Sequence, residues 1–323
     1  MGRELTNDFS WSKSRHEKFG ECLRAYYFHY YASWGGWSET APETARQLYT
    51  LKKLGNRWTW AGSVVHETIK QVLLRLRAGR DVDPAKVIDY AHRVMQDDWR
   101  HSAAKRYWQQ KNRKDFSGLV EHEYGEAVPG EEWKKNWENA RGALQWFLGS
   151  RWMDLARSLQ PHQWIEVDDK SFDDTVFHMD EVRVFAIPDF AYVDHDGAPV
   201  VVDWKTGRAR EGYDDQILGY ALYLSKRYDL RLDRMQAAIV YLNDGLERLV
   251  RIDEEALRGF KAHFAQSVGR MREVLADPEK NIPRDQTAFP MTQDLSVCGR
   301  CVFRRSCGRE GVALTPPVVV QGA

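Results

Sequence analysis

The fold is decided by the segment Val200-Val201-Val202-Asp203-Trp204-Lys205-Thr206-Gly207. Its apolar run follows the turn residues Asp194-His195-Asp196-Gly197, which predicts a buried strand that begins near residue 199. Side chains alternate along a strand, so Asp203 and Lys205 lie on one face and Trp204 on the other. A lone Asp-x-Lys is most often an exposed ion pair, but one that follows an apolar strand indicates a functional site.

A second acidic motif, Pro188-Asp189, precedes this strand. Residues 182–193 are rich in Val, Phe, Ile and Tyr, which predicts a strand that pairs with residues 199–203 as a hairpin. The hairpin would bring Asp189 beside Asp203. Two carboxylates suit Mg²⁺ or Mn²⁺, which keep waters for a substrate phosphate. Such an ion activates a bound water, and Lys205 would position that water or stabilise the charge on phosphorus.

The rest of the chain is predicted to form helices before these strands, and both helices and strands after them. Helical spacing and capping residues predict helices over residues 11–31, 59–77, 84–110, 131–159, 213–228 and 253–275. Further strands are predicted over residues 163–167, 235–242 and 248–252. We therefore expect an α/β fold in three parts. These are an N-terminal helical region (1–160), a core of sheet and flanking helices (161–280) and a C-terminal cysteine module (281–323).

The ordered motifs together resemble a known family. Pro188-Asp189 followed by Asp203-Trp204-Lys205 resembles the signature of the PD-(D/E)XK nuclease superfamily, and the trailing Thr206-Gly207 resembles its RecB-like branch. The resemblance implies a restriction-endonuclease-like core, in which a mixed central sheet is flanked by helices. It also implies that Asp189 and Asp203 hold a divalent metal and that Lys205 assists the attacking water.

Two further motifs match the RecB-like branch. Gly62-Ser63-Val64-Val65-His66 matches its Gly-x-x-x-His motif, and His66 would offer a neutral imidazole nitrogen to the metal. Gln216 and Tyr220 match its Gln-x-x-x-Tyr motif and share one helix face, where they would contact a DNA phosphate or hold Lys205. Glu166 resembles an acidic position of the branch and is a further candidate, although strand-end glutamates are usually solvated.

Four cysteines form a second candidate centre. Cys298, Cys301 and Cys307 lie near the C-terminus, and Cys22 is the only other cysteine. Four thiolates suit either an iron–sulfur cluster or a structural zinc. The layout of one distant cysteine with Cys-x₂-Cys-x₅-Cys after the core is similar to RecB-like nucleases with a 4Fe-4S cluster. These include nuclease domains of bacterial recombination complexes and exonucleases of CRISPR adaptation, and the resemblance implies a cluster that joins the two ends of this chain.

The net charge conceals an uneven distribution. Lys plus Arg and Asp plus Glu number 47 each, and this total alone speaks against a strongly basic nucleic-acid binder. Yet residues 51–114 carry a net charge of +9 and residues 115–200 one of −11, which suit a polyanion and a metal, respectively. The basic helices and the arginines around the cysteines would contact DNA phosphates without reading sequence. These arginines are Arg300, Arg304, Arg305 and Arg309.

The sequence predicts an intracellular, cytoplasmic protein. It has no run of about 18 apolar residues that would span a membrane, and residues 1–24 lack the apolar centre of a signal peptide. Structural disulfides are therefore not expected. No Gly-x-x-x-x-Gly-Lys-Ser/Thr motif is present, so a helicase partner would be a separate chain.

The function predicted from these motifs is that of a metal-dependent DNA nuclease. The family resemblance implies exonuclease action on DNA ends or single strands, in DNA repair, recombination or defence against foreign DNA. Two alternatives remain open: a nuclease-like DNA-binding partner of a helicase or recombination complex that cleaves little, and the same enzyme with zinc at the cysteines. The residues expected to act at the catalytic site are His66, Asp189, Asp203, Lys205, Gln216 and Tyr220.

Overall fold

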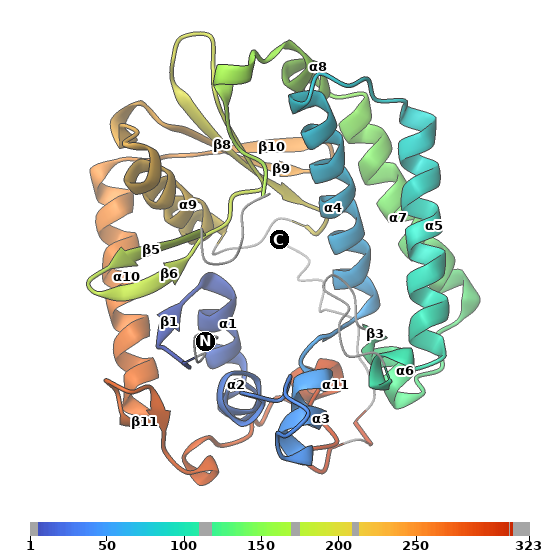
Figure 1. Ribbon diagram of the computed structural model, residues 1–323, viewed down its shortest axis with the longest axis vertical. Helices are drawn as coiled ribbons and strands as arrows, with labels where there is room; N and C mark the ends of the chain where they lie inside the picture. The colour runs from blue at the N-terminus through green and yellow to red at the C-terminus, as the bar shows by residue number, and fades with distance from the viewer. Residues whose placement is uncertain (1–5, 110–117, 169–174, 209–212, 310, 313–323) are drawn as a thin grey trace, which may run out of the picture.

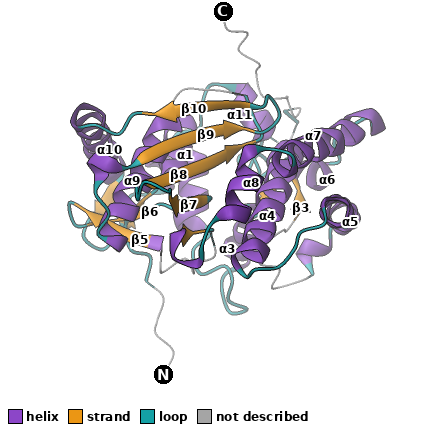
Figure 2. Ribbon diagram, turned by 90° about the horizontal axis from the view of Figure 1, so that it is seen from above, coloured by secondary structure: helices purple, strands orange, loops and turns teal. Residues whose placement is uncertain are grey.

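A five-stranded mixed sheet forms the centre of the computed structural model, which describes residues 6–109, 118–168, 175–208, 213–309 and 311–312. The strand order is β10-β9-β8-β7-β4. β8 and β9 run parallel, and the other neighbours are antiparallel. The strands are β4 (Trp164–Glu166), β7 (Phe190–Val193), β8 (Pro199–Lys205), β9 (Gln236–Tyr241) and β10 (Leu246–Val250). The predicted buried strand is therefore the central one, and helices lie on both sides of the sheet (Figure 1, Figure 2).

The sheet separates two hydrophobic cores, because alternate side chains of a strand point to opposite faces. Val200, Val202 and Trp204 pack in one core with residues of α4, α7 and α8. Val201 belongs to the other core, together with residues of α9 and α10. These helices are α4 (Arg57–Arg77), α7 (Gly130–Leu148), α8 (Arg151–Ser158), α9 (Tyr213–Tyr228) and α10 (Glu254–Glu273). Helices on both faces of a mixed sheet confirm the predicted α/β, restriction-endonuclease-like fold class.

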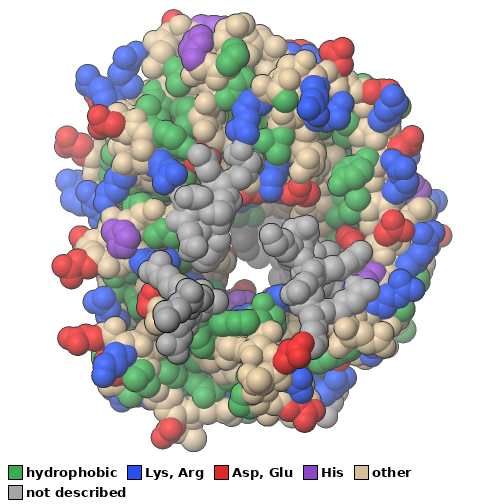
Figure 3. All heavy atoms as spheres, in the orientation of Figure 1, with side chains coloured by type: hydrophobic (Ala, Val, Ile, Leu, Met, Phe, Trp, Pro, Cys, Tyr) green, Lys and Arg blue, Asp and Glu red, His purple; other side chains and the backbone are tan. Residues whose placement is uncertain are grey.

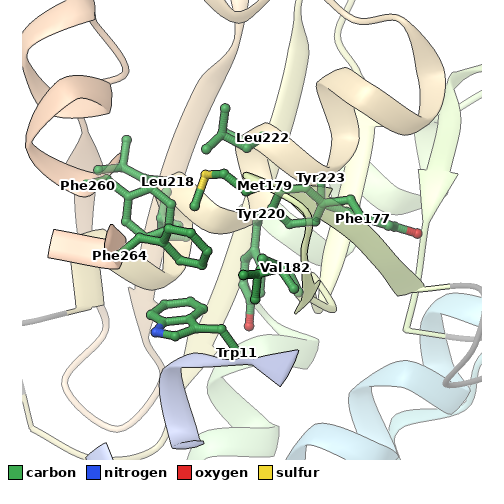
Figure 4. Close-up of a cluster of buried hydrophobic side chains, with 14 of the residues drawn as sticks. Trp11, Phe177, Met179, Val182, Leu218, Tyr220, Leu222, Tyr223, Phe260 and Phe264 are labelled. Atoms are coloured by element: carbon green, nitrogen blue, oxygen red, sulfur yellow. The ribbon is translucent and has the colours of Figure 1, made fainter. Parts of the chain in front are cut away.

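The N-terminal segment is anchored in the second core by Trp11. Its ring packs edge-on against Phe260 and Phe264 of α10, with centroids 5.9 and 5.4 Å apart (Figure 4). Its indole Nε1 donates a hydrogen bond to Ser267 Oγ at 2.9 Å. Residues next to Trp11 are thereby held beside α9 and α10.

A separate three-stranded sheet contains the first part of residues 182–193, which were predicted as one strand. That prediction is wrong: β6 (Val182–Phe185) pairs with β5 (Val176–Met179) and β1 (Ser10–Trp11), whereas β7 joins the central sheet. Between β6 and β7 lies Pro188, which lacks the N–H that a strand ladder requires. Asp189 therefore lies directly before β7 rather than within a longer strand.

Several predicted helices are shorter or divided. Residues 11–31 hold α1 (Lys13–Glu21), α2 (Leu23–Tyr27) and a π-helical turn (Phe28–Ala32), with Cys22 between α1 and α2. Residues 131–159 divide into α7 and α8, where Ser150 caps α8 by accepting a hydrogen bond from the Trp152 N–H. The helix predicted over 84–110 is α5 (Pro84–Ala103), followed by the 3₁₀ turn η2 (Arg106–Trp108); residue 110 lies outside the described residues.

Some short elements were not predicted. They are α3 (Glu43–Leu51), α6 (Val120–Tyr124) and the parallel pair β2 (Leu54–Gly55) and β3 (Gly118–Leu119). After α10, the chain forms β11 (Leu275–Asp277), β12 (Ile282–Pro283) and α11 (Leu295–Arg300), and α11 lies near α2 and α3 (Figure 1). Among the described helices, none has both the length and the apolar character that crossing a membrane requires.

Candidate active site

Two aspartates meet where β7 begins and β8 ends. Phe190 pairs with Val202 in the antiparallel register, which brings Asp189 beside Asp203. Asp203 is buried, with 2% of its surface exposed, whereas Asp189 is partly exposed. Asp189 Oδ2 accepts a hydrogen bond of 2.8 Å from the backbone N–H of Trp204, so its carboxylate is tied to the neighbouring strand. The predicted pairing of the two acidic motifs is present, although Asp189 lies outside regular strand.

Lys205 is held between Asp203 and helix α9. Its Nζ lies 2.6 Å from Asp203 Oδ2 and donates a 2.9 Å hydrogen bond to Gln216 Oε1. Gln216 Nε2 in turn donates to the hydroxyl of Tyr220, one helical turn further on. The ammonium also lies 4.5 Å from the centre of the Tyr213 ring. The structure thus brings Lys205, Gln216 and Tyr220 together in one hydrogen-bonded chain.

Helix α4 places His66 on the other side of Asp189. His66 Nδ1 lies 3.2 Å from Asp189 Oδ1. Gly62, one turn earlier, permits this approach, because a Cβ there would lie 2.8 Å from Thr206 Oγ1 just past β8. The Gly-x-x-x-His spacing therefore has a physical reason: the glycine lets the helix approach the strand end, and the histidine reaches the carboxylate.

The four ionisable groups form two opposite-charge pairs. Burial and the nearby Asp189 carboxylate together raise the pKa of Asp203 to about 6, against the opposing effect of Lys205. Burial also favours neutral Asp189, but His66 and Lys205 outweigh it and hold the pKa of Asp189 below its usual value. Burial lowers the pKa of His66, whereas the Asp189 carboxylate raises it, and the net pKa is raised. Asp203 thus carries the buried charge that most needs a cation.

We expect the metal-free protein to lose stability as the pH rises from about 5 to about 7. The pKa of Asp203 is raised from its ordinary value of 3.8 to about 6 in the folded protein, so its contribution to stability falls between these values and is largely lost above about pH 6. The raised pKa of His66 acts in the same direction, because stability that is complete below its unfolded pKa is lost above its folded pKa.

Asp203→Asn is the variant that tests this pH dependence. Its unfolding free energy should vary less with pH than that of the wild type, by about 1–2 kcal/mol over the interval. Denaturant titrations in a chelator at three pH values measure the difference. Equal pH dependence in the two proteins would contradict the assignment of a raised pKa to Asp203.

The arrangement fits a divalent cation held by two carboxylates. Asp203 Oδ2 is buried, and the Lys205 ammonium lies 2.6 Å from it as its ion-pair partner. One or two protein carboxylates, with waters and substrate phosphates, are the usual Mg²⁺ ligands in phosphoryl-transfer sites. His66 points to Asp189, and within the described ranges no three His, Cys, Asp or Glu side chains are arranged to hold a metal ion. Asp189 and Asp203 are therefore the ligands that the geometry favours.

Glu166 has a structural role in this arrangement. Its Oε1 accepts hydrogen bonds of 2.7 Å from the hydroxyls of Tyr223 and Tyr228, which tie β4 to α9. Asp168, which the sequence reasoning missed, lies closer to the site: burial raises its pKa, and the charge of Asp189 raises it further. Its Oδ2 lies 3.7 Å from Lys70 Nζ on α4. The sequence signal for Asp168 was its position directly after the strand predicted over residues 163–167, and the structure gives it a φ of 47°.

The four cysteines converge on one pocket. Cys22 comes from the junction of α1 and α2, and Cys298, Cys301 and Cys307 come from α11 and the loop after it; all four line the pocket and none forms a disulfide. Burial raises the pKa of Cys301 to about 12, with smaller contributions in the same direction from Cys307 and Cys22. Burial and Cys22 likewise raise the pKa of Cys307 to about 11. Among the described residues no three of these thiols are arranged to hold a metal ion, so a metal centre at the cysteines stays a prediction.

The arginines around the cysteines contact other protein groups, whereas the sequence predicted that they contact DNA. Arg304 is 1% exposed, pairs with Glu126 and donates a 2.9 Å hydrogen bond to the carbonyl of Gly299. Arg305 pairs with the buried Glu123, and Arg309 Nη1 lies 2.8 Å from Cys298 Sγ. The expectation that Arg304 contacts DNA phosphates is wrong, because its guanidinium is buried in these contacts.

The central sheet, its flanking helices and the paired acidic motifs define a nuclease-type α/β core. A family model described as the PD-(D/E)XK nuclease superfamily matches residues 10–308, and the chain belongs to this superfamily. The family resemblance predicted from Asp189, Asp203 and Lys205 is thereby confirmed at the level of the superfamily. A comparison with curated proteins found no match.

Proposed function

We propose that the protein is a metal-dependent deoxyribonuclease whose catalytic residues are Asp189, Asp203 and Lys205. One observation carries the proposal: the buried Asp203 carboxylate lies beside a second carboxylate and a lysine whose position is fixed. A second carboxylate beside a buried one is unfavourable, because the two charges repel each other, so such a pair persists where function requires it. Membership of a nuclease superfamily supports the same conclusion.

In this proposal the two carboxylates hold the metal and the lysine acts on the water. A divalent ion bound by Asp189 and Asp203 supplies Lewis-acid polarisation of the phosphodiester and lowers the pKa of a bound water. Trp204 fixes Asp189 Oδ2, and His66 holds its other oxygen. Lys205 Nζ, oriented by Gln216, donates a hydrogen bond to the attacking water or to the phosphoryl oxygen on which charge develops. Tyr220 orients Gln216.

The space around the site supports a single strand or a DNA end as the substrate. A cavity of about 620 Å³ is lined on one side by Lys205, Gln216 and Tyr220 and on the other by the N-terminal segment that includes Lys13. Figure 3 shows an opening at the centre of the molecule, in the region that Figure 1 places between α1, α4 and the central strands. Walls on several sides suit one separated strand better than a duplex on an open surface.

We further propose that the four cysteines hold a 4Fe-4S cluster. The support is the convergence of four free thiols from two ends of the chain on one pocket. A structural zinc has the same ligand preference, and the two metals are distinguished by analysis. A brown protein with about four irons per chain supports the cluster, whereas a colourless protein with one zinc would contradict it. We propose that a helicase supplies the single strands, because this sequence contains no P-loop motif.

Degradation of end-labelled DNA tests the proposed function. We expect linear single strands labelled at either end to be degraded in Mg²⁺ or Mn²⁺ and not in a chelator, because the carboxylates need the cation. Circular single strands of the same sequence are expected to resist, because an exonuclease requires an end. Equal cleavage of circles and linear strands would contradict exonuclease action. Tight DNA binding without cleavage would favour the alternative of a nuclease-like binding partner.

A further inference from the structure

Away from the active site, aromatic side chains are exposed around one pocket. Trp37 and Trp108 are 42% and 41% exposed, and both line a pocket of about 310 Å³. Trp34 is 38% exposed and packs edge-on against Trp37, with ring centroids 4.9 Å apart. Indole rings contribute most when they are buried, and exposed apolar surface that is gathered in one place marks an interaction site.

The rings around this pocket are held in place. Tyr49 of α3 contacts Trp37 with ring centroids 5.8 Å apart, and Trp108 Nε1 donates a 2.8 Å hydrogen bond to Glu123 Oε2. Gly36 fixes the chain before Trp37, because a Cβ there would lie 2.3 Å from the carbonyl oxygen of Ala45. A ligand would therefore meet rigid aromatic walls, which lowers the entropy cost of binding.

Cations lie beside these rings. Arg46 and Lys53 line the pocket. Lys53 Nζ lies 4.3 Å from the centre of the Tyr49 ring. The carboxylates at the pocket are Glu39 and Glu43, and Glu43 accepts a 2.9 Å hydrogen bond from Gln47. Aromatic rings that stack on bases, next to cations that attract phosphates, are the combination found in single-strand binding sites.

We propose that this pocket binds an unpaired base of single-stranded DNA, with Trp37 as the stacking surface and Arg46 and Lys53 beside the flanking phosphates. The inference rests on the proposed nuclease function and extends it to the choice of substrate. The pocket volume is at the lower end of the roughly 300–1,000 Å³ of small-ligand sites, which suits one base with its sugar. Because α3 and β8 lie on opposite sides of the central opening (Figure 1), the pocket holds the strand away from the reacting phosphate.

Binding of a fluorescently labelled oligothymidylate tests the proposal. The full chain is titrated in a chelator, at one fixed salt concentration, so that no cleavage occurs and phosphate contacts stay constant. We expect Trp37→Ala to weaken binding about tenfold, within the range of base stacking on an aromatic ring. Tyr90→Ala is the matched control, because Tyr90 is 43% exposed on α5 and does not line the pocket; its affinity should equal that of the wild type.

Two further comparisons separate stacking from simple apolar contact. Trp37→Phe keeps an aromatic ring and should retain most of the affinity, whereas Trp37→Leu should lose as much as Trp37→Ala. An oligonucleotide with abasic sites keeps the phosphates but lacks the bases. On this oligonucleotide the difference in affinity between wild type and Trp37→Ala should disappear. Wild-type affinity in Trp37→Ala or Trp37→Leu would overturn the proposal, as would an unchanged difference on the abasic strand.

Binding and cleavage measurements on the same protein preparations distinguish a failure of this inference from a failure of the proposed function. If the wild type cleaves linear strands in Mg²⁺ but Trp37→Ala binds as tightly as the wild type, only the stacking site is wrong. If the wild type binds the strand with the predicted Trp37 dependence but cleaves nothing, only the nuclease function is wrong. Thermal unfolding of each variant checks that it is folded, and Trp37→Leu provides the test if Trp37→Ala is not.

Discussion

Lys205→Ala is expected to lower the rate of DNA cleavage by at least about 100-fold while the protein stays folded. The lysine ammonium is the group placed to act on the attacking water or on the phosphoryl oxygen, and losing one such preorganised donor typically costs about 10²–10³ in rate. Its partners Asp203 and Gln216 remain in place on β8 and α9. Single-turnover cleavage of a labelled strand measures the loss without a contribution from product release.

Lys226→Ala is the matched control for this variant. Lys226 lies on α9, its Nζ contacts the carbonyl of His178, and it is outside the site. The control should cleave at the wild-type rate within a factor of about two. If Lys205→Ala also retained that rate, the assignment of Lys205 as a catalytic residue would be wrong.

Cys22→Ala is expected to remove the metal centre and to destabilise the protein strongly. Cys22 follows α1, whereas the other three cysteines belong to the C-terminal module, so the proposed centre would close a loop that contains most of the chain. Closing such a loop costs roughly 5 kcal/mol of chain entropy, which metal binding offsets because it contributes folding free energy. We expect the brown colour to disappear and the unfolding temperature to fall by about 10 °C or more.

Glu21→Ala is the control for the cysteine variant, because Glu21 is exposed and adjacent in sequence. It should keep the full metal content and the wild-type unfolding temperature. A Cys22→Ala protein that also kept both would show that Cys22 is not a ligand and that the centre does not join the two ends of the chain. Metal analysis and calorimetry on the same samples give both results.

The arrangement of the candidate site could be predicted because each of its motifs is marked by a local pattern. The apolar run of β8 located Asp203 and Lys205, and the i, i+4 spacing placed Gln216 and Tyr220 on one helix face. The sequence could also indicate the α/β fold class, because the apolar strand residues face two cores. The domain boundaries at residues 160 and 280 stay a prediction.

Contacts between segments that are distant in sequence could not be predicted in this way. The alternation of side chains along a strand assigns Glu166 to one face of β4. Only the packing of α9 shows that two tyrosine hydroxyls donate hydrogen bonds to its carboxylate. Arg304 belongs to a basic stretch, yet its partner Glu126 comes from the distant helical region. Sequence patterns also do not indicate that the rings around Trp37 are exposed, because aromatic residues are usually part of the core.

Single-turnover cleavage of a linear labelled strand by wild type and Asp203→Asn, in saturating Mg²⁺, tests the central claim most directly. Asparagine keeps the size of the side chain but removes the charge that holds the cation. We expect the wild type to cleave, a chelator to stop it, and Asp203→Asn to be slower by at least about 10³-fold, although it folds and binds the strand. Cleavage by Asp203→Asn within a few fold of the wild-type rate would contradict the proposed active site.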